Sequence, residues 1–188
     1  MKNLLFTLAF CGLSLFNYAQ SSIVEKSIFN IQTGFLGIYF NNESRLANSI
    51  ALRSEIGLDT GIWGNDINNI DSFLLTPVIT LEPRWYYNLN KRVQKKKKTT
   101  KNTGNFVSIK TSYHPDWFTI SSENNINFTP DISIIPTWGI RRHIGSHFNF
   151  ETGIGIGYLH YFFKEQYFYF EDEDQVALNL HLRIGYSF

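Results

Sequence analysis

The chain has 188 residues, which suits a single domain, and its formal net charge is +1. Hydrophobic residues make up 43% of it, charged residues 18% and aromatic residues 16%, a composition that excludes an intrinsically disordered protein. The balanced charge gives no electrostatic reason to expect nucleic-acid binding. The mean hydropathy is slightly negative, which excludes a bundle of membrane helices.

The N-terminus has the pattern of a secretory signal peptide. Lys2 supplies the positive charge, residues 4–16 supply a short apolar run, and we expect cleavage near residues 19–20. The apolar run is too short for a membrane-spanning helix. The alternative is a buried helix of a cytosolic domain. We therefore predict a cleaved leader over 1–20 and one domain over 21–188.

The only cysteine, Cys11, lies in this leader. A lipid-anchored protein would carry a small residue just before it, whereas Phe10 stands there, so lipid anchoring is the less favoured alternative. The chain after the leader has no cysteine. It therefore has no disulfide, no thiolate metal site and no cysteine nucleophile.

Apolar and polar residues alternate along much of the remaining chain, as they do in β-strands with two different faces. The alternation is strict from 176 to 188, far beyond the roughly five or six residues of a usual strand and long enough to cross a bilayer at a tilt. One face of this segment is apolar and consists of Val176, Leu178, Leu180, Leu182, Ile184, Tyr186 and Phe188. Similar alternation recurs over 50–59, 75–85, 107–114, 133–141 and 149–158.

Such strands form a barrel of one of two kinds. A secreted soluble barrel or sandwich points its apolar side inward, whereas a membrane barrel points it at lipid and keeps the charges inside. The predicted export, the closing phenylalanine and the aromatic residues gathered at strand ends favour the membrane barrel. These aromatic groups are Trp85, Tyr86 and Tyr87; Tyr113, Trp117 and Phe118; Tyr158, Tyr161, Phe162 and Phe163; and Tyr186 with Phe188.

The leader ending in Tyr18, Ala19 and Gln20 and the final residues 182–188 resemble those of small bacterial outer-membrane β-barrels, of the sort common in Bacteroidota. The resemblance implies an all-β, antiparallel up-and-down barrel in the outer membrane. It further implies that Leu182, Ile184, Tyr186 and Phe188 form the signal by which the assembly machinery recognises barrel chains. It carries no catalytic motif.

Counting backward from a periplasmic C-terminus, we expect strands at 176–188, 153–162, 132–141, 106–117, 75–85, 50–61 and 33–40. An even strand number requires an eighth, which we place within 22–31. The expected periplasmic connections are 41–46, 91–103 and 144–146, and the expected outer loops are 62–72, 120–130 and 164–175.

The polar faces of these strands predict a charged lumen. Its members are Arg53, Glu55, Asp59, Glu82, Arg84, Lys110, Arg141, Glu151, His181 and Arg183. Hairpin counting places Arg53 near Thr80 and within diagonal reach of Glu82, with Glu82 between Arg53 and Lys110. It also places Gly155 and Gly157 near Arg183 and His181, where glycine leaves room for long side chains. The signs nearly cancel, which favours a packed, closed lumen over a narrow pore.

Three further segments contain residues that could carry chemistry. The basic run over 91–101 is either a solvated turn or a contact for anionic lipid head groups or an acidic partner. The acidic run over 171–174 is either a solvated loop or a divalent-cation site. Ser112, His114 and Asp116 are candidates for a hydrolase triad, although Pro115 and their spacing favour barrel-wall packing. We expect no metal and no cofactor.

The function that these observations predict is a structural or surface-interaction role, without enzymatic activity, for a monomeric outer-membrane barrel. The expected partners are outer-membrane lipids, lipopolysaccharide and the barrel-assembly machinery, not nucleic acid. A porin-like channel for small solutes and a lipid-modifying enzyme are the alternatives.

Overall fold

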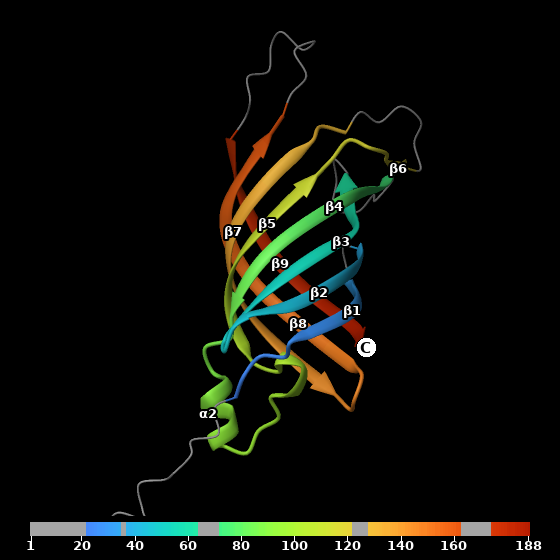
Figure 1. The fold of residues 1–188 in the computed structure, drawn as a ribbon. Helices are drawn as coiled ribbons and strands as arrows, with labels where there is room; N and C mark the ends of the chain where they lie inside the picture. The colour runs from blue at the N-terminus through green and yellow to red at the C-terminus, as the bar shows by residue number, and fades with distance from the viewer. Residues whose placement is uncertain (1–21, 35–36, 64–71, 122–127, 163–173) are drawn as a thin grey trace, which may run out of the picture.

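The computed structural model describes residues 22–34, 37–63, 72–121, 128–162 and 174–188 (Figure 1). The predicted leader over 1–20, most of the loop over 62–72 and residues 171–173 of the acidic run lie outside this part of the chain.

Eight long strands form a closed antiparallel barrel, which confirms the predicted fold class. They are β1 (Ser27–Gly34), β2 (Gly37–Ala47), β3 (Ile50–Trp63), β4 (Ser72–Trp85), β5 (Asn105–His114), β7 (Asp131–Ile144), β8 (Phe148–Tyr161) and β9 (Asp174–Ser187). Each strand pairs with the next, and β9 pairs with β1 to close the barrel. A two-residue strand, β6 (Ile120–Ser121), extends the edge of β4.

The barrel has two different ends (Figure 1). At one, called the turn end here, lie the connections over 48–49, 86–104 and 145–147, together with the C-terminus. At the other, called the loop end, lie the last residues of β1, β3, β5 and β8. The predicted tight turn at 144–146 is present but lies one residue later, at 145–147, because Ile144 still belongs to β7. Gly145 adopts a left-handed φ of 65° there, which glycine tolerates at little cost.

The first hairpin differs from the prediction. The eighth strand is β1, which begins inside the expected 22–31 window. The expected strand over 33–40 is wrong, because residues 33–34 end β1 and residues 37–40 begin β2. Residues 41–46 also belong to β2 and not to a turn. The true turn lies at Asn48 and Ser49. Asn41 and Glu43 resembled turn residues because they are polar, yet both are completely buried inside the barrel. In a barrel with a polar interior, asparagine and glutamate occupy the positions that leucine occupies in a soluble strand.

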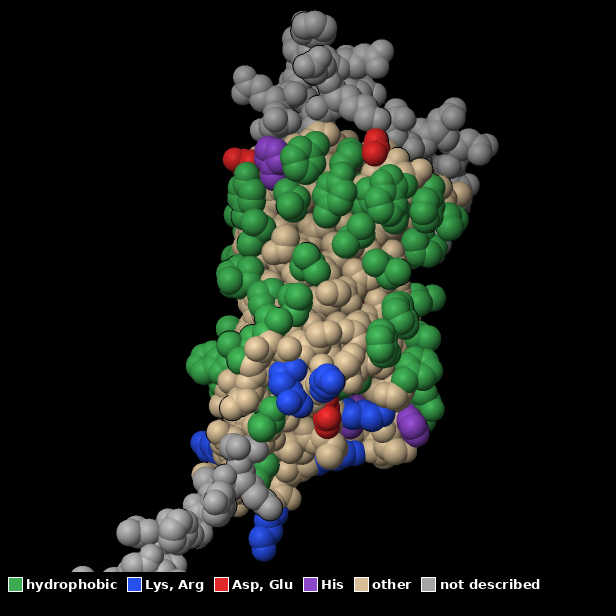
Figure 2. All heavy atoms as spheres, viewed as in Figure 1, with side chains coloured by type: hydrophobic (Ala, Val, Ile, Leu, Met, Phe, Trp, Pro, Cys, Tyr) green, Lys and Arg blue, Asp and Glu red, His purple; other side chains and the backbone are tan. Residues whose placement is uncertain are grey.

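The two faces of the wall are inverted relative to a soluble protein. On β9 the apolar face points outward, with Leu178 77% exposed and Leu180 74% exposed, while Asn179 and Arg183 of the same strand are buried. Figure 2 shows hydrophobic side chains spread over the wall, with the charged groups on this face gathered toward its two ends. The barrel is therefore apolar outside and charged inside.

The turn end is closed by two chain segments. The connection over 86–104 contains a short helix, α2 (Leu89–Gln94), and a 3₁₀ turn over Thr100–Asn102. Its Tyr86 and Leu89 pack into a small apolar cluster with Val24, Ala51 and Phe106. The N-terminal residues are tied to the same end, because Val24 N donates to the Asn48 carbonyl and Glu25 N donates to Asn102 Oδ1. In the part of the chain that the structure describes, no helix has the length and hydropathy needed to cross a membrane.

Candidate functional site

The barrel interior holds a balanced set of charges. Among the described residues, four arginines and four glutamates are at most 5% exposed: Arg53, Arg84, Arg141 and Arg183 against Glu43, Glu55, Glu82 and Glu151. Isolated charges in such a setting would be strongly unfavourable, so each of them requires a partner of opposite sign.

The strand register places these charges in two rows of alternating sign. Glu43, Arg53 and Glu82 lie directly opposite one another on β2, β3 and β4. On the other side of the barrel, Arg141, Glu151 and Arg183 lie directly opposite one another on β7, β8 and β9. Opposite charges at facing positions stabilise strand pairing.

Glu151 joins the two rows across the lumen. Its carboxylate accepts hydrogen bonds from Arg53 Nη1 at 2.9 Å, from Arg84 Nη1 at 2.9 Å and from Arg84 Nη2 at 2.7 Å. Arg53 also pairs with Glu55, which in turn accepts from Arg183 Nη1 at 2.8 Å. These bonds run between opposite walls, so side chains of the described residues cross the lumen at this height.

Glu43 ties the network to the turn-end connection. It accepts hydrogen bonds from Arg84 Nη1 at 3.1 Å and from Arg141 Nη1 on the barrel side. From the connection, Tyr86 Oη and Asn102 Nδ2 each donate to it at 2.9 Å. Burial, and next the neighbouring Glu43 carboxylate, raises the pKa of Tyr86, which keeps its hydroxyl protonated and able to donate. The sequence prediction missed Glu43 because it placed a turn there, although alternation from Tyr39 through Asn41 to Glu43 was a usable signal.

Two of the predicted registers were wrong. Arg53 lies opposite Glu82, and it is Glu55 that lies opposite Thr80, because the β3–β4 hairpin pairs two residues further along than the count assumed. On β8, Gly155 and Gly157 face Asn179 and Ala177, not Arg183 and His181. The expected room-making glycine is Gly153, where a Cβ would lie 2.5 Å from His181 Cε1.

The register sets Lys110 beside Glu82, as predicted, because Thr80 pairs with Ser112 and Arg84 with Ser108, but the two side chains do not bond to each other. Glu82 makes its hydrogen bonds to Arg84 Nη2 at 2.7 Å and to Ser108 Oγ at 2.6 Å. Lys110 therefore forms no ion pair or hydrogen bond with any described residue, and its side chain is half-buried.

A second cluster lies inside the barrel nearer the loop end. His114 Nδ1 is 2.8 Å from Asp131 Oδ1, and His114 Nε2 is 3.0 Å from Asp59 Oδ2. Tyr39 Oη donates to the other oxygen of Asp59. Carboxylates only accept hydrogen bonds, so both ring nitrogens of His114 donate, as in the protonated imidazole. Asp131 was not predicted, because the expected strand began one residue later, although it shares the parity of Ser133 and Thr137.

This geometry does not assemble the hydrolase triad considered from sequence. A triad histidine needs one free ring nitrogen toward the nucleophile and one carboxylate behind it. Both nitrogens of His114 are engaged by carboxylates, and Ser112 Oγ instead pairs with Thr80 Oγ1 at 2.8 Å.

Between the charge network and the loop end lies an internal cavity of about 680 Å³. Its polar lining includes Asp59, Lys110 and His114, and its apolar lining includes Ile135 and Ala177. Solvent reaches it, since the Asp59 side chain is 27% exposed. Cavities of this size hold small organic ligands in other proteins.

The basic run at the turn end is partly structural. Lys98 Nζ donates to the Gly145 carbonyl, Lys101 Nζ donates to the Ser187 carbonyl at 2.9 Å, and Arg92 Nη2 donates to the Lys98 carbonyl at 2.8 Å. These bonds brace the connection against the neighbouring turn and the C-terminal strand. Lys91, Lys95, Lys96 and Lys97 remain exposed.

The described part of the chain contains no cluster of three or more histidine, cysteine, aspartate or glutamate residues arranged to hold a metal ion. The chain matches no protein-family model, no curated protein and no solved structure.

Proposed function

We propose that this chain is an outer-membrane β-barrel with a closed lumen, which presents its loop end to the exterior in a structural or surface-interaction role. The observation that carries the proposal is the inverted wall. A continuous surface of exposed leucine, isoleucine and valine surrounds an interior of paired charges. Water does not stabilise such a surface, whereas lipid does.

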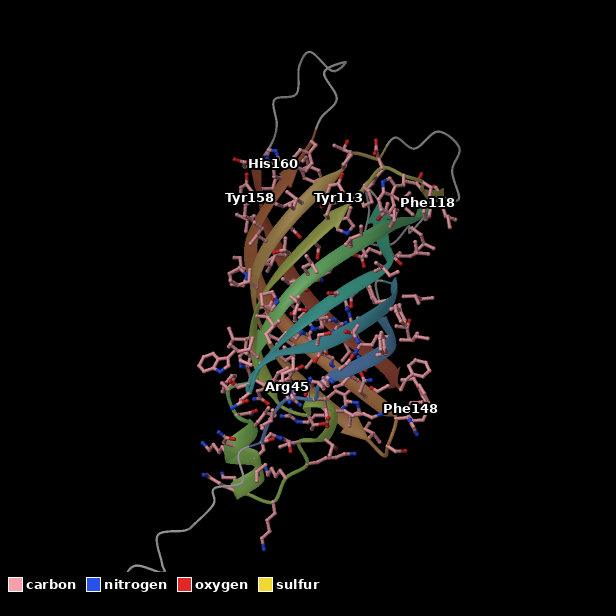
Figure 3. The ribbon with its side chains drawn as sticks, in the orientation of Figure 1. Arg45, Tyr113, Phe118, Phe148, Tyr158 and His160 are labelled. Carbon is pink, nitrogen blue, oxygen red and sulfur yellow. The ribbon has the colours of Figure 1, made fainter. Side chains whose placement is uncertain are left out.

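Exposed aromatic side chains border this apolar surface at both ends. At the loop end they are Tyr113, Trp117, Phe118, Tyr158 and Phe162, and at the turn end they are Trp85, Tyr87, Phe148, Tyr186 and Phe188. Figure 3 shows Tyr113, Phe118 and Tyr158 near the loop end and Phe148 near the turn end. Aromatic girdles of this kind mark the two interfaces of membrane barrels.

The spacing of the two girdles suits an outer membrane. Phe148 and Tyr158 lie about ten residues apart on one strand, which is about 34 Å of chain and about 26 Å along the axis at a typical tilt of about 40°. The lipid-facing band of membrane barrels is about 25 Å tall. The final-strand residues Leu182, Ile184, Tyr186 and Phe188 all face outward, which supports their proposed role as an assembly signal.

Location and orientation are testable with single cysteines, because the chain has no cysteine after Cys11. Thr119→Cys lies at the loop end and Ser146→Cys at the turn end, and they form a matched pair. A membrane-impermeant maleimide applied to intact cells should label Thr119→Cys alone, and permeabilised cells should allow both to react. Equal labelling of both in intact cells, or recovery of the protein in the soluble fraction, would refute the proposal.

Closure of the lumen is testable by planar-bilayer recording. The folded state is first verified by heat-modifiable gel mobility, and a porin recorded in the same bilayer serves as the positive control. We expect no discrete openings, because side chains cross the lumen and the 86–104 connection covers the turn end. Stable single-channel steps would instead favour the porin-like alternative.

A further inference from the structure

The cavity near the loop end contains a donor side chain that is bonded to no acceptor among the described residues. Lys110 lines it and has no hydrogen bond or ion pair with any described residue. Three carboxylates act electrostatically on this lysine, and each already has its own partners. Glu55 binds Arg53 and Arg183. Asp59 binds Tyr39 and His114, and Glu82 binds Arg84 and Ser108. A half-buried ammonium with no carboxylate bound to it has its donors free for an incoming anionic acceptor, and a charge-assisted hydrogen bond is stronger than a neutral one.

His181 adds a second unsatisfied group to the same cavity. Its Nε2 is buried and makes no hydrogen bond in the described part of the chain, and it lies 3.5 Å from a Glu151 oxygen that is already bonded to Arg53 and Arg84. Its imidazole rests against Gly153, so the absence of a side chain on β8 sets its position.

The other wall of the cavity is apolar. Ile135 and Ala177 are buried side chains that face it, and Phe128 lies above His114 with the two ring centroids 6.5 Å apart. Ligand sites of this size usually combine such an apolar wall with a few polar groups that fix orientation.

We propose that this cavity binds a small amphipathic anion, whose carboxylate or phosphate oxygens accept hydrogen bonds from Lys110 and whose short apolar tail packs on Ile135 and Ala177. The ligand enters from the loop end, because the arginine–glutamate network crosses the lumen on the turn-end side of the cavity. The binding site goes beyond the structural role proposed above and does not depend on where the barrel resides, so either idea can fail alone.

The test is isothermal titration calorimetry on the folded full barrel in non-ionic micelles, with protein-free micelles as the blank. The probes are hexanoate and hexyl phosphate, with 1-hexanol and hexylammonium as neutral and cationic controls of equal tail length. We expect saturable binding of one or both anions and at least tenfold weaker binding of the two controls. Equal binding of anion, alcohol and amine, or no saturable binding by either anion, would overturn the proposal.

Two variants locate the site. Lys110→Met should weaken anion binding at least tenfold, whereas Lys95→Met, which removes an exposed lysine at the turn end, should leave it unchanged. Ala177→Leu keeps every charge but fills the cavity, and it should weaken binding even if Lys110→Met fails to fold. Wild-type affinity in folded Lys110→Met or in folded Ala177→Leu would place the ligand elsewhere and refute the assignment. Hexanoate alone, hexyl phosphate alone or both binding identifies which anionic head group the cavity accepts.

Discussion

Replacing Glu151 by glutamine removes the charge that links the two sides of the lumen. The wild-type carboxylate accepts three hydrogen bonds from Arg53 and Arg84, at 2.7 to 2.9 Å, and is completely buried. Glutamine preserves the volume and one acceptor oxygen. It replaces the other oxygen with an amide donor that points at a guanidinium, which also only donates.

The expected cost follows from the balance of charges. Four buried arginines face four buried glutamates, so Glu151→Gln leaves one arginine charge without a counter-ion. Removing one partner of a buried ion pair typically costs about 3–5 kcal/mol. Each charge-assisted hydrogen bond contributes about 1.5–3 kcal/mol, and the remaining amide oxygen preserves part of that. We therefore expect the free energy of unfolding to fall by about 3–5 kcal/mol, a large share of the roughly 5–15 kcal/mol of a typical domain.

The assay is urea unfolding of the barrel in phospholipid vesicles, followed by tryptophan fluorescence and by heat-modifiable gel mobility. Asp174→Asn is the control, because the Asp174 side chain is 64% exposed and its loss should leave the unfolding midpoint unchanged. The double variant Glu151→Gln/Arg84→Gln restores neutrality. It should cost about 1–3 kcal/mol less than the sum of the two single changes.

Two results would refute this reasoning. A loss below about 1 kcal/mol for Glu151→Gln would mean that water or relaxation neutralises the lumen, since buried pairs lose more than this when broken. Strict additivity in the double variant would mean that Glu151 and Arg84 do not interact energetically, whatever their distance.

Three further outcomes are expected from the same unfolding assay. Leu180→Arg, on the outer face at mid-height, should lower the free energy of unfolding in vesicles by about 2–4 kcal/mol, and Val176→Arg near the loop end by about 0–1 kcal/mol. Equal and negligible losses would mean that this face does not contact lipid. Gly139→Val should cost about 1–3 kcal/mol, because its Cβ would lie 2.3 Å from Phe106 Cζ, and Phe106→Leu in the same chain should recover part of that. Tyr86→Phe should cost about 1–3 kcal/mol, because the buried Glu43 carboxylate loses a donor; an unchanged midpoint would mean that water replaces the hydroxyl.

Alternation predicted the wall well, because a closed barrel forces every residue of a strand to face either in or out. Arg53, Glu82 and Arg183 were assigned inward on parity alone, and each is buried. Alternation did not predict the first hairpin, β1–β2, correctly. Its Asn41 and Asn42 are turn-forming residues elsewhere, and only the polar interior of this barrel makes Asn41 and Glu43 strand residues.

The cavity lay beyond sequence reasoning for a different reason. The cavity exists where no side chain spans the lumen. Which side chains span it depends on contacts between strands that are distant in the sequence. Lys110 appeared to be a partner of Glu82 because the two strands are neighbours, yet Arg84, on the same strand as Glu82, occupies that carboxylate first. No pattern along one strand records such competition.

The buried charges have their clearest effect on the register in which neighbouring strands pair. A slip of two residues between β3 and β4 would preserve every inward and outward assignment, so the hydrophobic pattern does not oppose it. It would, however, move Arg53 from Glu82 to Thr80 and leave Glu82 facing Ala51. A corresponding slip between β8 and β9 would move Glu151 from Arg183 to His181.

Each slipped register would break several ion pairs inside a low-dielectric lumen, and each broken pair costs far more than an intact pair contributes. The two alternating rows therefore act mainly against wrong alignments, and their net effect on the stability of the correct barrel is smaller than their number suggests. The alternation of polar and apolar residues alone allows several registers of similar energy, which differ by an even number of residues. The positions of the four arginines and four glutamates favour one of these registers. This explains why so many charges face the lumen.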